Sequence, residues 1–126
     1  DILAERTRQA ERYGAALERM AHLVAPYEPE YASRTWQSYC VRVGAHAPVG
    51  RTELMRRLLR DGIATRRGVM AIHEEPSYPE PLRVPLPHTE AAAADVIMLP
   101  LFPGLTDEQQ DYVIERLAAH VVALAA

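Results

Sequence analysis

The first 24 residues repeat apolar positions at the spacing of a helix with one buried face. The apolar residues step by three, four or seven positions: Leu3, Ala10, Tyr13, Leu17, Met20 and Val24. Pro26 and Pro29 follow, and proline both lacks the backbone donor and disfavours helix at the residue before it, so we expect the helix to end there. Neither an initiator Met nor a capping residue precedes Asp1, so we expect the sequence to start within a longer protein.

The next two segments predict a strand and a second helix. Residues 36–43 (WQSYCVRV) are rich in aromatic and β-branched side chains, which is typical of a strand. Residues 51–61 predict a helix, and Gly62 follows at the position of a left-handed helix cap. The apolar face of this helix consists of Leu54, Met55, Leu58 and Leu59.

The middle of the chain is less regular. Two apolar stretches, 63–65 and 69–72, flank Arg66-Arg67-Gly68, which indicates either an interrupted strand or a strand followed by a loop. Residues 76–87 predict a stiff, irregular loop because they hold five prolines: Pro76, Pro79, Pro81, Pro85 and Pro87.

The last part predicts a short helix, a strand and a long helix. Thr89 is placed to cap a helix over 91–94, and 96–101 (VIMLPL) is an apolar strand. Thr106 and Gln109 form a capping box at the start of the final helix. The apolar face of that helix consists of Val113, Ile114, Leu117, Val121 and Leu124. This order of elements predicts an α+β fold, a small sheet with helices packed largely on one face.

Composition narrows the class of protein. The 126 residues suit one domain, 25% of them are charged and 48% are apolar, as in an ordinary globular protein. No apolar stretch reaches the roughly 20 residues that span a bilayer. A net charge of −3 disfavours a nucleic-acid binder. Residues 1–15 carry more charge than a signal peptide does, so we expect no such leader and a cytoplasmic protein. The single Cys40 is expected to be a small buried residue.

All fourteen basic residues are arginines, and this limits the chemistry available to the chain. Without lysine, no side chain can act as an amine nucleophile. No Gly-rich loop follows a strand, so the phosphate-binding loops of nucleotide enzymes are absent. We also expect no metal site, because none of the five histidines pairs with another at ligand spacing on a helix, and Ser77 stands where a zinc-protease pattern starting at His73 would need its second histidine.

Candidate binding residues cluster around the middle of the chain. Arg56, Arg57 and Arg60 fall on the polar face of the predicted second helix and are expected to be solvated. Arg66 and Arg67 differ, because they stand between apolar segments next to a glycine, where a guanidinium can bind a phosphate or carboxylate. His73, Glu74 and Tyr78 follow in the same loop-rich segment.

Several segments together resemble the DegT/StrS family of sugar aminotransferases. The segments that carry the resemblance, in matching order and spacing, are 2–17, 36–43, TRRGVMAIHEEPSY (65–78), LPHTE (86–90) and LPLFPGLTDEQQDYVIERL (99–117). The resemblance implies the C-terminal small domain of the aspartate-aminotransferase type fold, with a mainly antiparallel sheet. It also implies pyridoxal phosphate as cofactor, a homodimer, and transfer of an amino group, usually from glutamate, to a keto-sugar that is often nucleotide-linked.

The resemblance further implies how this chain contributes to such an enzyme. The cofactor-binding lysine would belong to a large domain upstream, residues 1–25 would connect to that domain, and the apolar stripe of the first helix would be partly uncovered here. The segment 65–78 would face the substrate, and it departs from the family's common tyrosine-proline form, having Arg66-Arg67-Gly68-Val69-Met70 instead.

We therefore expect substrate-binding residues but no catalytic, cofactor-binding or metal-binding residue in this chain. Arg66 or Arg67 would bind an anionic part of the substrate, and His73 and Tyr78 would add polar contacts. The chain alone would be inactive. The alternative is a non-catalytic α+β module that binds a partner through its first helix or a small ligand near Arg67.

Overall fold

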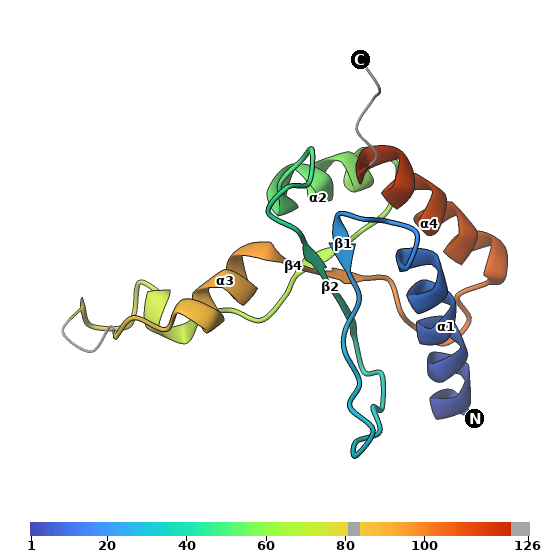
Figure 1. Cartoon of the computed structure of the whole chain (residues 1–126), viewed down its shortest axis with the longest axis horizontal. Coiled ribbons are helices and arrows are strands. Elements are labelled where there is room, and N and C mark those ends of the chain that lie inside the picture. The colour runs from blue at the N-terminus through green and yellow to red at the C-terminus, as the bar shows by residue number, and fades with distance from the viewer. Residues whose placement is uncertain (81–83, 122–126) are drawn as a thin grey trace.

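The computed structural model describes residues 1–80 and 84–121 and has an α+β fold (Figure 1). Within these residues the helices are α1 (Ile2–Leu17), α2 (Arg51–Arg60), α3 (Pro87–Asp95) and α4 (Asp107–Val121), with a 3-10 turn, η1 (Ile72–Glu74). The strands are β1 (Leu23–Val24), β2 (Tyr39–Val43), β3 (Arg66–Arg67) and β4 (Val96–Leu99). They form one antiparallel sheet in the order β1-β2-β4-β3. The predicted fold class is confirmed.

The hydrophobic core lies between one face of the sheet and the helices α1, α2 and α4 (Figure 1). Val41 lies opposite Ile97, and Tyr39 lies opposite Leu99, so these four side chains share the core face of the sheet. Leu54 and Leu58 of α2 and Leu117 of α4 are fully buried against it. Each buried aliphatic side chain of this size stabilises the fold by about 1.5–3 kcal/mol.

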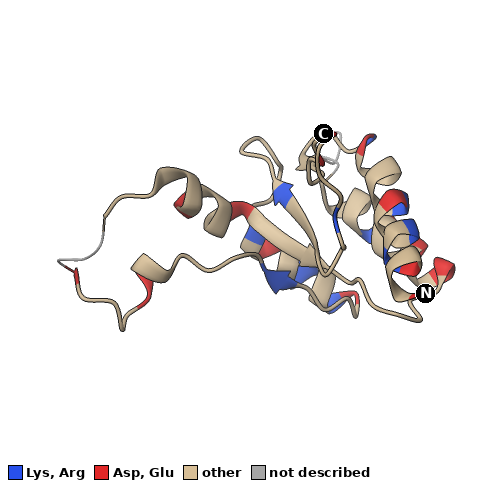
Figure 2. Ribbon diagram, turned by 90° about the horizontal axis from the view of Figure 1, so that it is seen from below, with Lys and Arg blue, Asp and Glu red and all other residues tan. Residues whose placement is uncertain are grey.

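Unlike the other three helices described, helix α3 lies away from this core. None of its residues is buried, and Figure 1 shows it at the base of an arm that extends from the body. We call residues 68–95 the arm. Figure 2 shows acidic but no basic residues along its described part, whereas β3, which leads into the arm, consists of two arginines.

Helix α1 is shorter than the sequence predicts. Asp1 caps it by accepting a 3.1 Å hydrogen bond from the Leu3 amide, but the helix ends at Leu17 rather than near Pro26. Tight turns follow, and Leu23 then pairs with Val43 as strand β1. The apolar pattern continues past Leu17 because Met20 and Leu23 are also buried. The prediction was wrong because the sheet, not proline, ends the helix.

The stripe of α1 was expected to be partly uncovered, and this is wrong for most of its length. Ala10, Tyr13 and Leu17 are at most 4% exposed because they pack in the core of this chain. Ile2 and Leu3, by contrast, are 58% and 47% exposed. Within α1, the large apolar side chains that remain exposed are therefore those of the first turn.

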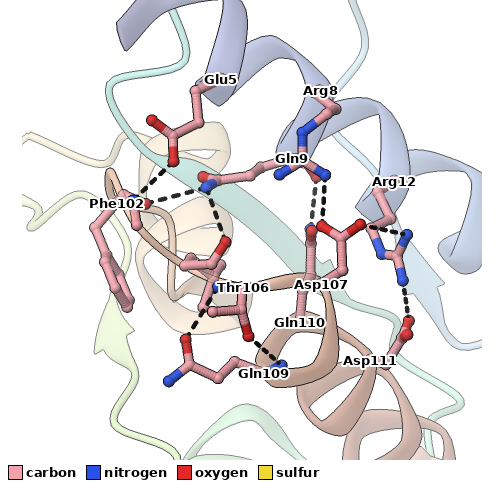
Figure 3. A network of polar contacts seen from close by, with 12 residues as sticks. Glu5, Arg8, Gln9, Arg12, Phe102, Thr106, Asp107, Gln109, Gln110 and Asp111 are labelled. Carbon is pink, nitrogen blue, oxygen red and sulfur yellow. Dashed lines mark hydrogen bonds and ion pairs between the residues drawn. The ribbon is translucent and has the colours of Figure 1, made fainter.

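Two buried glutamines join α1 to α4 and the segment before it (Figure 3). Gln9 Nε2 donates to the Phe102 carbonyl oxygen at 3.1 Å, and Gln110 Nε2 donates to the Gln9 carbonyl oxygen at 2.7 Å. Charged contacts surround this pair and join Arg8 to Asp107, Arg12 to Asp111, and Glu5 to the Gly104 amide. The hydrogen bond from the Arg8 guanidinium holds the pKa of Asp107 below its usual range. Helix α1 is thus an integral part of this fold.

Strand β2 begins three residues later than predicted. Trp36 has a φ of 49°, outside the extended region, and its ring stacks on Tyr39 with centroids 5.6 Å apart. Cys40 within β2 is partly exposed, which corrects the expectation that it is buried. Its side chain alternates with the buried Tyr39 and Val41 and therefore lies on the outer face of the sheet.

The C-terminus and the polar face of α2 match the predictions from sequence. At its C-terminus Gly62 has a φ of 80°, the amide of Ile63 donates to the Leu58 carbonyl, and the amide of Gly62 donates to the Leu59 carbonyl. These bonds satisfy the last carbonyls of the helix and confirm the predicted left-handed cap. The solvated polar face is also confirmed, since Glu53 forms ion pairs with Arg56, Arg57 and Arg60.

Helices α3 and α4 begin at different kinds of signal. Helix α3 starts at Pro87, two residues before the expected cap Thr89, because the Glu90 carboxylate accepts from the Leu86 amide at 2.8 Å. At α4 the capping box is confirmed: the Gln109 amide donates to Thr106 Oγ1 at 3.2 Å, and the Thr106 amide donates to Gln109 Oε1 at 3.0 Å. Leu124 and part of the predicted proline-rich loop lie outside the described residues. No described helix has the length and apolar character needed to cross a bilayer.

Candidate functional site

The two arginines expected at an interruption form a strand instead. Arg66 pairs with Met98 and Arg67 pairs with Ile97, while the flanking segments 63–65 and 69–71 are irregular. Pairing with β4 decides this, because neither arginine has a strong preference for strand. Both alternatives, an interrupted strand and a strand followed by a loop, placed the strand in the apolar segments and were therefore wrong about its position. Strand β3 ends where Gly68 packs on Val96, with its amide 3.0 Å from the Val96 carbonyl oxygen.

The pairing sends the two arginine side chains to opposite faces of the sheet. Arg67 shares the face of the buried Ile97, whereas Arg66 shares the face of the partly exposed Met98. Arg67 lines two cavities at the base of the arm, and Arg66 lines neither of them. Arg67 is therefore the one of the two that faces a candidate binding site.

The first cavity has a volume of about 200 Å³ and lies between β3, η1, α3 and the start of α2. It carries charges of both signs. Two of its lining residues are the basic Arg51 and Arg67, and three are acidic: Glu74, Glu75 and Glu90. The arrangement suits a ligand that presents both an anionic and a cationic or hydroxyl group.

The second cavity has a volume of about 370 Å³ and lies between β3 and α2. Arg51 and Arg67 line this cavity too, and Arg56 joins them. None of the described residues that line it is acidic, and its apolar wall includes Met55, Leu59 and Ala64. The two cavities thus share Arg51 and Arg67 and differ in all their other lining residues.

His73 lies next to the first cavity but is itself 91% buried, being 9% exposed. Its Nε2 lies 3.0 Å from Glu90 Oε1, which joins η1 to α3. The Leu86 amide and, to a lesser degree, His73 hold the pKa of Glu90 below its usual range. Glu90 therefore carries a negative charge into the cavity at neutral pH.

Tyr78, the last of the predicted site residues, does not line either cavity. It is 37% exposed, and its amide donates to the Glu75 carbonyl oxygen at 2.9 Å. The structure therefore places Arg67 and Glu90 on one cavity, with His73 beside Glu90, whereas Arg66 and Tyr78 line neither of the two cavities. Whether any of the four predicted residues binds substrate stays a prediction.

Three possible metal ligands meet beside the first cavity. One atom each from His73, Glu74 and Glu90 lies within 4.8 Å of the others. Sequence spacing did not reveal this group, because Glu90 comes from α3, 16 residues after Glu74. The hydrogen bond from His73 to Glu90 already accounts for their approach, so the absence of a metal stays a prediction.

Sequence reasoning also missed Arg51. It opens α2 and was treated there only as part of a helix, yet it lines both cavities. One signal was available, because an arginine in the first turn of a helix places a cation at the positive end of the helix dipole. Such a placement is unfavourable unless something else compensates for it.

Known proteins share both the sequence pattern and the fold. A sequence model of the DegT/DnrJ/EryC1/StrS aminotransferase family matches residues 1–118. A "pleiotropic regulatory protein" from Geobacillus stearothermophilus is 32% identical over 123 residues, which cover 90% of this chain and 31% of that protein.

Solved aminotransferase structures have the same fold as this chain. The aminotransferase TlmJ from Streptoalloteichus hindustanus superimposes with a TM-score of 0.86 and 30% identity, covering 98% of this chain and 33% of its own. DesV from S. venezuelae, solved in complex with a ketimine intermediate, has a TM-score of 0.84 and 25% identity, covering 96% of this chain and 32% of its own. The chain thus spans about a third of the length of the proteins it matches, and in the solved structures that part is the C-terminal third.

Proposed function

This chain belongs to the DegT/DnrJ/EryC1/StrS aminotransferase family, and from that premise we propose that it is the C-terminal domain of a sugar aminotransferase. The proposed enzyme depends on pyridoxal phosphate and moves an amino group from glutamate to a keto-sugar, which is often nucleotide-linked. The observation that supports this most is the match over 98% of the chain to the C-terminal third of an aminotransferase. A cytoplasmic homodimer and a link from residues 1–25 to a large domain belong to the same proposal.

The cofactor's covalent attachment does not fit this chain. All fourteen of its basic residues are arginines, so no side chain offers the amine that bonds the cofactor. In the proposed enzyme the cofactor supplies the electron sink for amino transfer, and residues outside this chain hold it. We therefore assign this domain no proton transfer and limit its role to binding and orienting the sugar.

Within that role we assign the anionic part of the substrate to Arg67. Of the two candidate arginines it is the one that lines both cavities, and its side chain has no hydrogen bond or ion pair within the described residues. The carboxylates around the first cavity are suited to accept hydrogen bonds from sugar hydroxyls. His73 orients the Glu90 carboxylate. Tyr78 would add a further polar contact to the sugar.

The proposal is tested by replacing Arg67 with Ala in the full-length enzyme. Loss of a charge-assisted contact removes about 1.5–3 kcal/mol of binding. The KM for the sugar should rise about ten- to a hundredfold, since 1.4 kcal/mol is about tenfold. The half-reaction with the amino donor should change little, because that substrate does not need this contact. Arg67→Lys should restore only part of the affinity, since it lacks the planar fork.

Arg60→Ala serves as the matched control. It removes the same charge from a side chain that is 71% exposed and lines neither cavity. Unchanged sugar kinetics in Arg67→Ala and in the Arg66/Arg67 double variant would refute the assignment of this site. A full-length protein that binds ligands but transfers no amino group would favour the non-catalytic module instead.

A further inference from the structure

Arg51 presents an unusual pair of buried polar atoms. Its Nε and Nη1 are buried and have no hydrogen-bond partner within residues 1–80 and 84–121. Buried polar atoms in folded proteins nearly always have a partner, so each exception needs an explanation. An unsatisfied charged group is especially costly. An anion bound beside this guanidinium would offset its charge.

The position of Arg51 in α2 supports the same reading. It is the first residue of the helix, and Gly50 before it contributes no side-chain cap. The free amides of a first turn and the positive end of the helix dipole both favour an anion, whereas Arg51 adds another positive charge. The acidic residue of this turn, Glu53, forms its ion pairs with Arg56, Arg57 and Arg60.

The second arginine is supplied by the sheet. Arg67 lines the same two cavities as Arg51, and its side chain likewise has no partner in the described part of the chain. In the second cavity, where none of the described lining residues is acidic, the two guanidiniums repel each other. An anion placed between them converts this repulsion into two charge-assisted contacts.

The linings of the two cavities show on which side the anion belongs. Glu74, Glu75 and Glu90 around the first cavity would repel it. The second cavity has no acidic lining among the described residues, and Arg56 gives it a third positive charge. Its volume of about 370 Å³ falls within the range of small-molecule sites, about 300–1,000 Å³.

The second cavity also has an apolar wall that the fold itself does not explain. Met55, Leu59 and Ala64 line it, and Leu59 is 65% exposed. A ligand with a phosphate at one end and a flat, weakly polar body would cover this wall and satisfy the arginines together. A bare phosphate would satisfy only the arginines.

We propose that Arg51 and Arg67 bind a phosphate group of a nucleoside diphosphate, whose base and ribose lie along Met55 and Leu59. This rests on the proposed function, because a nucleotide-linked sugar would bring such a group to the enzyme. It goes beyond that function by adding Arg51 and Arg56 to the site and by placing the nucleotide on this domain.

The test is isothermal titration calorimetry on the 126-residue chain with thymidine diphosphate, inorganic phosphate and thymidine. Thymidine diphosphate should bind at one site per chain. Arg51→Ala and Arg67→Ala should each weaken it about ten- to a hundredfold. Arg60→Ala, which removes the same charge from the far end of α2, should leave the affinity within about twofold, a change of about 0.4 kcal/mol.

Further variants and ligands separate the remaining readings. Arg51→Lys and Arg67→Lys keep the charge and should lose only part of the affinity, so they keep the test valid if an alanine variant does not fold. Tighter binding of the diphosphate than of phosphate supports the apolar contact, and Leu59→Ser should then weaken only the diphosphate. Equal binding of both assigns the site to free phosphate and refutes the nucleotide.

Two results would overturn the proposal as a whole. One is undiminished binding of thymidine diphosphate by the Arg51 and Arg67 variants. The other is an equal loss in Arg60→Ala, which would indicate non-specific attraction to positive charge. Because these measurements need neither cofactor nor sugar, a protein that binds the diphosphate but lacks aminotransferase activity would refute the proposed function and leave this site standing.

Discussion

Gly68→Ala should destabilise this fold, because the residue lies too close to β4 for any side chain. A Cβ added at Gly68 would lie 2.6 Å from Val96 Cγ1 and 2.8 Å from Val96 Cβ. Valine cannot move aside easily, since it is branched at Cβ and restricted in χ1. Val96 is also held in β4, where it pairs with Arg42 of β2. The alanine methyl group must therefore push β3 away from β4.

The expected size follows from two opposing effects. Overpacking of this kind costs about 1–3 kcal/mol, and the smaller entropy of alanine in the unfolded chain returns about 0.4–1 kcal/mol. The net loss should be about 1–2 kcal/mol. With a urea dependence of about 1–3 kcal/mol/M, the unfolding midpoint should fall by on the order of 1 M. Because β3 carries Arg67, binding of thymidine diphosphate should weaken in the same variant.

The assay is urea unfolding of the 126-residue chain followed by circular dichroism and by the fluorescence of Trp36. Gly14→Ala is the matched control, because a Cβ there would lie 3.8 Å from the Tyr39 hydroxyl, an ordinary contact within helix α1. It should stabilise the chain by about 0.5–1 kcal/mol. Combining Gly68→Ala with Val96→Ala removes the closest contact but not the Cβ, so the glycine substitution should cost less in that background. A Gly68→Ala variant as stable as the wild type, or one whose cost does not depend on residue 96, would refute the reasoning.

Three further predictions concern the chemistry and stability of the chain. Mixed with pyridoxal phosphate, the chain should leave the cofactor's absorbance unchanged, because it has no lysine; a stoichiometric adduct trapped by borohydride at one site would contradict this. Hydrogen bonds from Arg116 and, to a lesser degree, His120 hold the pKa of Asp61 below its usual value of 3.8. The Asp61 carboxylate therefore stabilises the fold fully above its usual pKa, and this stabilisation is lost as the pH falls through the lowered pKa. Urea midpoints measured in acid should therefore fall less steeply for Asp61→Asn than for the wild type, and parallel curves would refute the role of this carboxylate. Thr106→Ala should cost about 0.5–2 kcal/mol in the same unfolding assay, with Thr106→Ser close to wild type; an equal loss in both would argue against the capping bond.

The sequence was most informative where a few neighbouring residues decide the structure. Thr106 with Gln109, and Gly62 after α2, act through bonds to backbone groups within one turn, so their local pattern was enough to predict them. The end of α1 and the strand β3 depend on distant partners instead. Leu23 leaves the helix to pair with Val43, and Arg66-Arg67 becomes a strand because β4 offers an edge. Neither partner is visible in local periodicity.

In the candidate site, too, one residue was predicted from its neighbours in sequence and its partner was not. The chemistry of Arg67 next to a glycine made it a candidate from sequence alone. Its companion Arg51 is 16 residues away, on another element, and only the packing of α2 beside β3 brings the two to the same cavities. The bond between His73 and Glu90 spans 17 residues and likewise depends on how the arm folds back on itself.

The central claim is that this chain is part of a sugar aminotransferase, and nitrogen transfer tests it most directly. The full-length protein, loaded with pyridoxal phosphate, would be incubated with ¹⁵N-labelled glutamate and a nucleotide-linked keto-sugar. Mass spectrometry should then show an amino sugar that carries ¹⁵N, formed together with 2-oxoglutarate. A folded, cofactor-loaded protein that leaves a panel of keto-sugars unlabelled, with glutamate and with other amino donors, would contradict the account.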